Sequence, residues 1–123
     1  MIGALPWIGV AALGALGAYA RFSVGAVVTG WRPSAFPFGT FVVNLTGGFL
    51  LGLLVGLSVT GDALLVLGTG FLGGYTTFST WMVEGQRLGE DGDWRRVTLY
   101  LAASLLGGAA TTGAGWLVGG LFG

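Results

Sequence analysis

The 123-residue sequence contains no cysteine, no histidine and no lysine. Without cysteine there are no disulfides and no thiolate chemistry, and without histidine the usual general base and the commonest metal ligand are missing. Only 8% of the residues are charged, against roughly 25% in an ordinary soluble domain. So few charges cannot cover a surface that faces water, so much of the surface is expected to face lipid.

The five arginines and five acidic residues balance to a net charge of zero, which leaves no basic patch for a nucleic acid. The first charged side chain is Arg21, so the leading residues lack the basic region of a secretory signal peptide and are expected to remain as a helix. No catalytic arrangement is visible, and we expect no enzymatic activity.

Uncharged stretches divide the chain into candidate membrane spans. A spanning helix needs roughly 20 apolar residues, and the uncharged stretches of that length are 1–20, 33–61, 63–83 and 97–123. Pro33 and Pro37 break the chain, because proline removes a backbone donor and restricts the residue before it. The sequence therefore predicts an all-α integral membrane protein, a single domain over residues 1–123 with four transmembrane helices near 4–29, 36–60, 63–87 and 96–121.

The alternative, four core helices of a soluble bundle, would need a polar face on each helix, and no segment has one. Glycines at spacing four let membrane helices approach closely. Gly48, Gly52 and Gly56 follow this spacing, and so do Gly115 and Gly119. They serve packing either within one copy or between copies. Because four helices barely enclose a solvated pathway, we expect an oligomer.

The arginines are distributed unevenly between the two sides of the predicted bundle. Arg32, Arg87, Arg95 and Arg96 fall on the side of the first and third loops, and Arg21 lies nearest to that side. Cytoplasmic loops of membrane proteins carry an excess of basic residues. We therefore expect these two loops in the cytoplasm and both termini outside.

Polar groups are costly inside a bilayer, so those within the predicted spans are candidates for function. Arg21 in the first span has three interpretations: it binds an anion, anchors a loop carbonyl, or reaches back to the membrane surface. Thr40 and Asn44 share a face of the second span. The Asn44 amide either donates to an anion without bringing negative charge or joins helices by hydrogen bonding.

The third span contains the string GFLGGYTTFSTW at residues 70–81, which is a poor continuous helix. Irregular backbone at membrane depth is tolerated only where it is buried or lines a cavity, and its carbonyls can then bind a cation. Phe78 and Trp81 share a face. They form a packing pair, or they turn their positive ring edges toward a small anion.

The last span carries the hydroxyls of Tyr100 and Ser104 on one face, with Thr111 two turns beyond Ser104. These hydroxyls either continue a hydrogen-bonding track or bond the backbone carbonyl four residues back, as serine and threonine in membrane helices commonly do. Each of these residues alone is weak evidence for a functional role. The whole set of uncharged hydrogen-bond donors within the spans is stronger evidence.

Three strings resemble the Fluc family of fluoride channels, also called CrcB proteins: GALGAYARF at 14–22, GTFVVNLTGGFLLG at 39–52 and GFLGGYTTFSTWMVE at 70–84. The resemblance covers nearly the whole chain. It implies a third helix broken near its middle and an antiparallel dimer with two fluoride pathways in the inner (plasma) membrane. It also implies a structural sodium ion, Na+, at the dimer centre, held by backbone carbonyls of Gly73 and Thr76 from both copies.

The same resemblance assigns positions along the fluoride pathway. Asn44 would donate to fluoride, Phe78 matches the first of two paired phenylalanines, and Thr40 and Glu84 match a vestibule pair. The other pathway positions that the resemblance implies are Thr77, Ser79, Thr80, Tyr100, Ser104 and Arg21.

The chain departs from the family pattern in three respects. Trp81 stands where the second phenylalanine is expected, which keeps an aromatic edge on the pathway and adds an indole donor. Gly108 interrupts the hydroxyl track one turn after Ser104. The arginine bias differs from the balanced loops of members that insert in both orientations, so the partner is either a second copy or an oppositely oriented paralogue.

The expected function is passive export of cytoplasmic fluoride, which gives fluoride resistance. One alternative is a small multidrug-resistance-type transporter, but proton-coupled export needs an acidic residue within a span, usually the first. This first span holds Arg21 instead, and Glu84 lies at a helix end. The other alternative is a structural membrane subunit without transport of its own.

Overall fold

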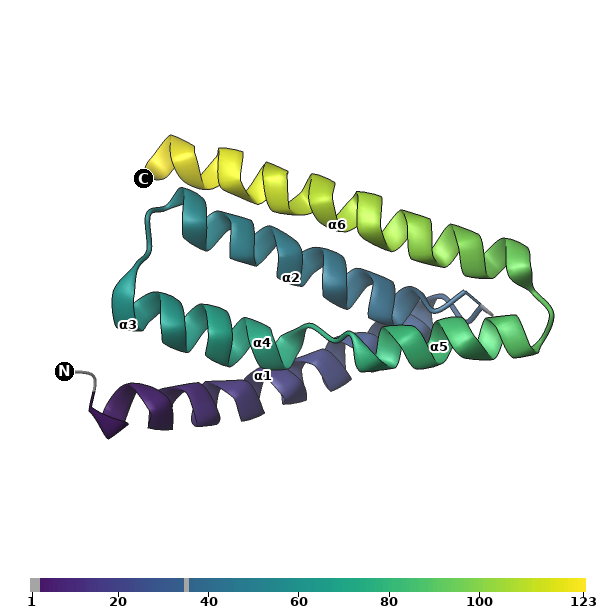
Figure 1. The fold of residues 1–123 in the computed structure, drawn as a ribbon, viewed down its shortest axis with the longest axis horizontal. Coiled ribbons are helices and arrows are strands. Elements are labelled where there is room, and N and C mark those ends of the chain that lie inside the picture. Colours follow the sequence, from purple (N-terminus) through teal and green to yellow (C-terminus); the bar gives the residue numbers. More distant parts are fainter. Residues whose placement is uncertain (1–2, 35) are drawn as a thin grey trace.

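The computed structural model describes residues 3–34 and 36–123, and of Ser79 the backbone alone. Its regular elements are all helices (Figure 1). Three are long and apolar enough to cross a membrane: α1 (Ala4–Trp31), α2 (Phe38–Gly56) and α6 (Trp94–Phe122). The third predicted span is built from four shorter pieces: α3 (Gly61–Leu64), η1 (Leu65–Leu72), α4 (Gly73–Tyr75) and α5 (Ser79–Glu90).

The helix ends follow the turn chemistry of the sequence. Pro37 occupies the position before α2, where its missing N–H costs no helical hydrogen bond. After α2, Ser58 adopts a left-handed backbone with φ of 62°, which turns the chain toward α3. The side chain of Asp93 caps α6. The largest shift from the predicted ends is four residues, at the end of α2, which stops at Gly56 rather than residue 60.

The third span is broken near its middle, as the sequence predicts. It begins with a π-helical stretch, η1, a wide helix that is rare and often found at functional sites. Gly73 and Gly74 are still helical, so the break falls after the glycines. The backbone becomes extended at Thr76, with φ of −79° and ψ of 158°, and the helix resumes at Ser79.

Two pairs of closely packed elements build the interior. In Figure 1, α2 runs beside α6, and α1 packs against η1 and α4. Glycine makes both approaches possible: a Cβ at Gly52 would collide with the carbonyl of Thr112, and a Cβ at Gly17 with the carbonyl of Phe71. The spaced glycines of α2 and α6 are therefore used within one copy, which was one of the two interpretations.

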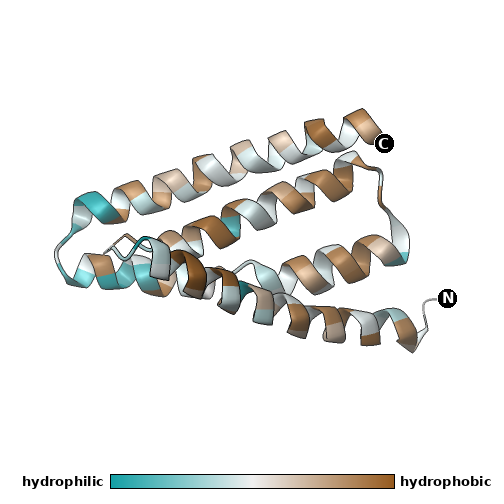
Figure 2. Ribbon diagram, turned by 180° about the vertical axis from the view of Figure 1, so that it is seen from behind, coloured by the Kyte–Doolittle hydropathy of each residue, from teal (hydrophilic) through white to brown (hydrophobic). Residues whose placement is uncertain are grey.

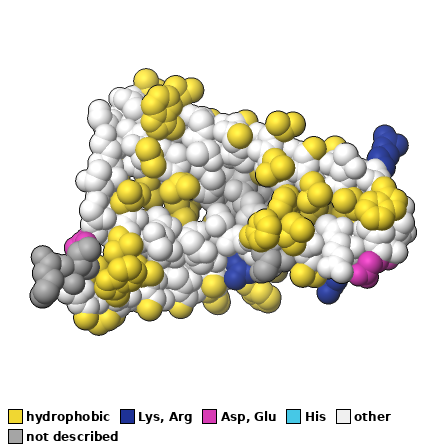
Figure 3. All heavy atoms as spheres, in the orientation of Figure 1, with side chains coloured by type: hydrophobic (Ala, Val, Ile, Leu, Met, Phe, Trp, Pro, Cys, Tyr) yellow, Lys and Arg dark blue, Asp and Glu magenta, His cyan; other side chains and the backbone are white. Residues whose placement is uncertain are grey.

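Polar and apolar surface are separated along the molecule. Figure 2 shows most of the hydrophilic residues around the α1–α2 and α5–α6 connections, at the end opposite the two termini. Hydrophobic side chains are spread over the face in Figure 3, and Phe22 and Phe122 are 76% and 79% exposed. A soluble monomer rarely exposes contiguous apolar surface on this scale. The chain is a multi-pass membrane protein.

Candidate functional site

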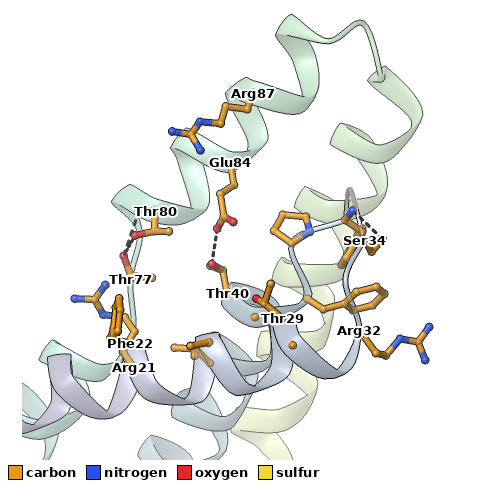
Figure 4. Close-up of a pocket in the computed structure, with 18 of the residues that line it drawn as sticks. Arg21, Phe22, Thr29, Arg32, Ser34, Thr40, Thr77, Thr80, Glu84 and Arg87 are labelled. Atoms are coloured by element: carbon orange, nitrogen blue, oxygen red, sulfur yellow. Dashed lines mark hydrogen bonds between the residues drawn. The ribbon is translucent and has the colours of Figure 1, made fainter.

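An open cavity of about 940 Å³ lies at the polar end of the molecule, between α1, the start of α2 and the segment that leads from the break into α5. Figure 4 shows the side chains that line it. Five of them are residues that the sequence predicts on the pathway: Arg21, Thr40, Thr77, Thr80 and Glu84. The fold therefore brings together predicted residues from three separate strings.

Thr40 and Glu84 meet across this cavity. The Thr40 hydroxyl, on α2, donates a hydrogen bond to Oε1 of Glu84, on α5 (Figure 4). Arg87 also lines the cavity, although the sequence indicated only its place at the end of the third span, on the side of the first and third loops. Arg87 follows Glu84 by three residues, so both side chains lie on one face of the helix. This spacing is the sequence signal that could have predicted Arg87 at the cavity.

Asn44 closes the break by pairing with Thr77. The Asn44 Nδ2 donates to the Thr77 carbonyl oxygen at 3.0 Å, and the Thr77 N–H donates to Asn44 Oδ1 at 2.9 Å. Two paired residues of neighbouring antiparallel strands exchange hydrogen bonds in the same way, but here a side-chain amide takes the place of one of the two backbones. One of the two Nδ2 hydrogens is used here, so the other is left to donate elsewhere.

Arg21 supports the break from the other side. Its Nε donates to the carbonyl oxygen of Gly74 at 3.1 Å. Of the three interpretations of Arg21, the structure shows the anchored carbonyl. The neighbouring Tyr75, which the sequence analysis did not single out, is 6% exposed, and its hydroxyl lies 2.8 Å from the Thr46 hydroxyl. The break is thus held by side chains from both α1 and α2.

These contacts free two backbone carbonyls. In a continuous helix the carbonyls of Gly73 and Thr76 would accept from the N–H groups of Thr77 and Thr80. Those donors instead bond Asn44 Oδ1 at 2.9 Å and the Thr77 hydroxyl at 3.3 Å. None of the described residues donates across the break to either carbonyl.

Freed carbonyl oxygens are suitable ligands for a hard cation such as sodium. The described residues contain no cluster of three acidic, cysteine or histidine side chains that would hold a metal. The free carbonyls of Gly73 and Thr76 therefore fit the kind of ion that the resemblance implies.

A second cluster lies between α5 and α6. Trp81 Nε1, the Tyr100 hydroxyl and the Ser104 hydroxyl are buried and have no hydrogen-bond partner among the described residues. The rings of Trp81 and Tyr100 lie 6.3 Å apart, measured between centroids, and the rings of Phe78 and Trp81 lie 5.5 Å apart. Phe36 packs edge-on against Tyr100 at 5.3 Å. We call the three unpartnered groups the donor cluster.

Buried polar atoms without a partner are uncommon because each costs about 1–3 kcal/mol. Three of them on two neighbouring helices therefore call for a ligand, and all three belong to residues predicted on the pathway. Tyr100 is fully buried, at 0% exposed. Bulk water therefore cannot replace the missing hydrogen-bond partner of its hydroxyl. The donor cluster is suited to a ligand that accepts hydrogen bonds.

Other predicted residues lie apart from these groups. The Phe78 side chain is 70% exposed, on the outside of the single chain. The hydroxyl of Ser79 lies outside what the structure describes. Thr111 donates to the carbonyl of Gly108 at 3.2 Å, so it bonds the preceding turn and does not extend the track.

Comparison with known proteins gives a consistent result. The family described as "CrcB-like protein, Camphor Resistance (CrcB)" matches residues 8–116. The chain is similar to "Fluoride-specific ion channel FluC 2" of Mycobacterium tuberculosis, with 50% identity over 109 residues, covering 82% of this chain and 86% of that protein.

Two further relatives come from other bacteria. "Fluoride-specific ion channel FluC 1" of Symbiobacterium thermophilum is 43% identical over 120 residues, covering 92% of this chain and 90% of that protein. "Fluoride-specific ion channel FluC" of Gloeobacter violaceus is 46% identical over 109 residues, covering 85% and 87% respectively. The family model, over residues 8–116, spans the segments that build the cavity and the break, and the chain belongs to the CrcB-like family.

Proposed function

We propose that this chain is a subunit of a passive, fluoride-selective channel that lets cytoplasmic fluoride leave the cell. The relatives described above are named as fluoride-specific ion channels. The observation that carries the proposal is the unpartnered pair of hydroxyls of Tyr100 and Ser104. They lie inside an apolar helix, where a polar group without a hydrogen-bond partner costs free energy. A hydrogen bond to a transported anion would offset that cost.

Fluoride is small and tightly hydrated, so a pathway must replace its water with hydrogen-bond donors at close range. Uncharged donors do this without a fixed positive charge that would trap the ion. Thr77 and Thr80 line the cavity, and the Thr77 hydroxyl donates to the Thr80 oxygen at 3.2 Å. The Thr80 hydroxyl hydrogen and the second hydrogen of Asn44 Nδ2 therefore remain to donate to an anion. The hydroxyls of Tyr100 and Ser104 continue the series on α6.

The cavity serves as the entrance for the anion. Arg21, Arg32 and Arg87 line it together with Glu84 and Asp91, so its walls carry more positive than negative charge. A cavity with this bias raises the local concentration of anions. By the excess of arginine around the first and third loops, this end faces the cytoplasm, and the protein sits in the inner (plasma) membrane.

The channel is a dimer, because one chain leaves the aromatic part of the pathway open. Phe78 is 70% exposed, so a ring predicted to face fluoride has no second wall within one copy. An antiparallel partner, either a second copy or an oppositely oriented paralogue, supplies that wall and generates two equivalent pathways. The exposed apolar face of each copy then contacts its partner or lipid.

In this dimer the carbonyls of Gly73 and Thr76 from both copies would hold a structural sodium ion, whose positive charge would offset the carbonyl dipoles. The chain's own contribution is to keep these carbonyls free. Asn44 takes the N–H of Thr77 away from Gly73, and Arg21 occupies the adjacent carbonyl of Gly74.

Fluoride enters cells as neutral hydrogen fluoride at low pH and ionises inside, and the membrane potential drives the anion outward. Expression of this chain in a bacterium that lacks its own fluoride channels tests the function in cells. We expect growth at fluoride concentrations that arrest the parent strain. Normal membrane insertion of the chain without any gain in growth, alone or with a paralogue, would contradict the proposal.

A further inference from the structure

We propose that the indole N–H of Trp81 is a direct ligand of the transported anion, so that this chain holds fluoride at a three-donor site formed with the hydroxyls of Tyr100 and Ser104. The inference rests on the proposed function and adds to it a site of tighter binding. It also states what tryptophan does at position 81 that phenylalanine would not do: it supplies an N–H donor to the anion.

The unpartnered indole nitrogen of Trp81 can bond only an acceptor. An indole N–H is a hydrogen-bond donor and never an acceptor. Trp81 Nε1 is buried, and no described residue accepts from it. The group that completes it must therefore be an acceptor outside the described atoms of this chain, such as a water molecule or an anion. A cation is excluded at this atom.

The other two members of the donor cluster are hydroxyls, which can also donate. The hydroxyls of Tyr100 and Ser104, one turn apart on α6, can each rotate their hydrogens toward an acceptor. All three atoms lack a partner, so none is already committed to another group of the described chain. An anion can accept from the indole N–H and from both hydroxyls, whereas a water molecule has two lone pairs and accepts from two donors at most.

Trp81 lies between an exposed ring and a buried one. The Trp81 ring lies between the Phe78 ring, at 5.5 Å, and the Tyr100 ring, at 6.3 Å. Phe78 is exposed on the outside of the chain, whereas Tyr100 is fully buried. An anion passing from the outer aromatic ring to the inner hydroxyls therefore passes Trp81. The indole N–H offers it a donor where a phenylalanine offers only a ring edge.

The added donor should make fluoride bind more tightly at this point of the pathway. A hydrogen bond to a charged group is stronger than one to a neutral group, and its loss corresponds to roughly tenfold or more in a dissociation constant. This chain should therefore saturate with fluoride at a lower concentration than a variant without the N–H. Tighter binding also slows release, so maximal flux should not fall when the donor is removed.

The direct test is nuclear magnetic resonance of the five indole N–H groups of the reconstituted protein, with sodium fluoride as the titrant and sodium chloride as its control. Trp81→Phe identifies the Trp81 signal. We expect fluoride to move that signal downfield in a saturable manner, chloride to leave it in place, and the indole of Trp116, whose side chain is 55% exposed, to respond to neither. An unmoved Trp81 signal means that a permanent water occupies the site, and it overturns the inference.

The second test separates binding from transport in liposomes. Trp81→Phe should raise the fluoride concentration of half-maximal flux about tenfold without lowering the maximum. Trp116→Phe is the matched control and should change neither value. A lower maximum with an unchanged half-saturation concentration means that Trp81 only packs, which also overturns the inference.

A benzothienylalanine at position 81 guards against misfolding, because it keeps the bicyclic shape and lacks the N–H. It should reproduce the Trp81→Phe shift, and flux parameters equal to those of the wild type would contradict the inference. Failure of the inference and failure of the proposed function are distinct. A silent Trp81 signal with normal fluoride flux removes only the ligand role, whereas a protein that passes no fluoride at all removes the channel.

Discussion

Asn44 and Thr77 exchange two hydrogen bonds, at 3.0 and 2.9 Å, across the break in the third span. One side chain from α2 thereby replaces the helical partner that the Thr77 N–H would otherwise have. The pair explains how an interrupted helix persists inside a membrane, where an unsatisfied backbone group costs several kcal/mol. It also leaves one amide hydrogen of Asn44 free to meet an anion.

Asn44→Asp tests this double role. An ionised aspartate keeps the acceptor for the Thr77 N–H but loses the donor to the Thr77 carbonyl, and its negative charge repels fluoride. We expect fluoride efflux from liposomes to be abolished while the variant still assembles as a dimer, as judged by size-exclusion chromatography. Efflux at the wild-type rate would remove Asn44 from the pathway.

Arg21→Met tests the anchor on the opposite side of the break. Methionine fills a similar apolar volume but cannot donate to the Gly74 carbonyl, which Arg21 reaches at 3.1 Å. The variant should lose about 1.5–3 kcal/mol of stability against unfolding in detergent, the range for a hydrogen bond from a charged group.

The matched control is Arg32→Met. The Arg32 guanidinium lies 5.0 Å from the centroid of the Phe38 ring at an exposed position, which is worth only about 0.5–1 kcal/mol. Equal losses for the two variants would show that the Gly74 carbonyl does not depend on Arg21.

Gly52→Ala tests the close contact of α2 and α6. The added Cβ would collide with the carbonyl of Thr112, a backbone atom that cannot rotate away. Overpacking of this kind costs about 1–3 kcal/mol, measured as a lower thermal midpoint. Gly113→Ala on α6 is the control, since its Cβ would meet nothing within 4 Å. That substitution should stabilise the helix by about 0.5–1 kcal/mol, so the two variants should shift stability in opposite directions.

Asp93 predicts a pH dependence at the start of α6, outside the membrane. The hydrogen bond from the Arg96 side chain, at 2.5 Å, lowers the pKa of Asp93 from its ordinary value of 3.8. A carboxylate whose folded-state pKa is lowered stabilises the fold above its unfolded pKa, and this contribution is lost as the pH falls through the folded value.

Asp93→Asn isolates this effect. Asparagine still caps α6 but carries no charge. The thermal midpoint of the wild type should exceed that of the variant by a constant margin above pH 3.8, and the margin should shrink as the pH falls below that value. A margin that does not change with pH across this range would contradict the conclusion that the negative charge of Asp93 stabilises the fold. The effect is small because the pair is solvent-exposed.

The sequence alone predicts the four-span layout and the broken third span, because both follow from local rules. Charges and prolines end membrane helices, and the run Gly73-Gly74 weakens one. The exact place of the break does not follow from local rules. It falls at Thr76 because Asn44 and Arg21, from other helices, replace the helical hydrogen bonds there.

The grouping of the site residues was predictable only in part. Thr40 and Glu84 are 44 positions apart, and only the resemblance to a family pairs them. The contacts Arg21–Gly74 and Thr46–Tyr75 had no pairing signal in one sequence, since each joins two helices whose relative rotation depends on glycine packing.

The most direct test of the account is fluoride efflux from liposomes, followed with a fluoride electrode. The vesicles hold this chain alone or with an oppositely oriented paralogue, and a potassium ionophore sets the membrane potential. We predict rapid, passive fluoride release in at least one pairing, with chloride retained, which would also exclude a drug transporter and a transport-inactive subunit. Vesicles that keep their fluoride in every pairing would contradict the account.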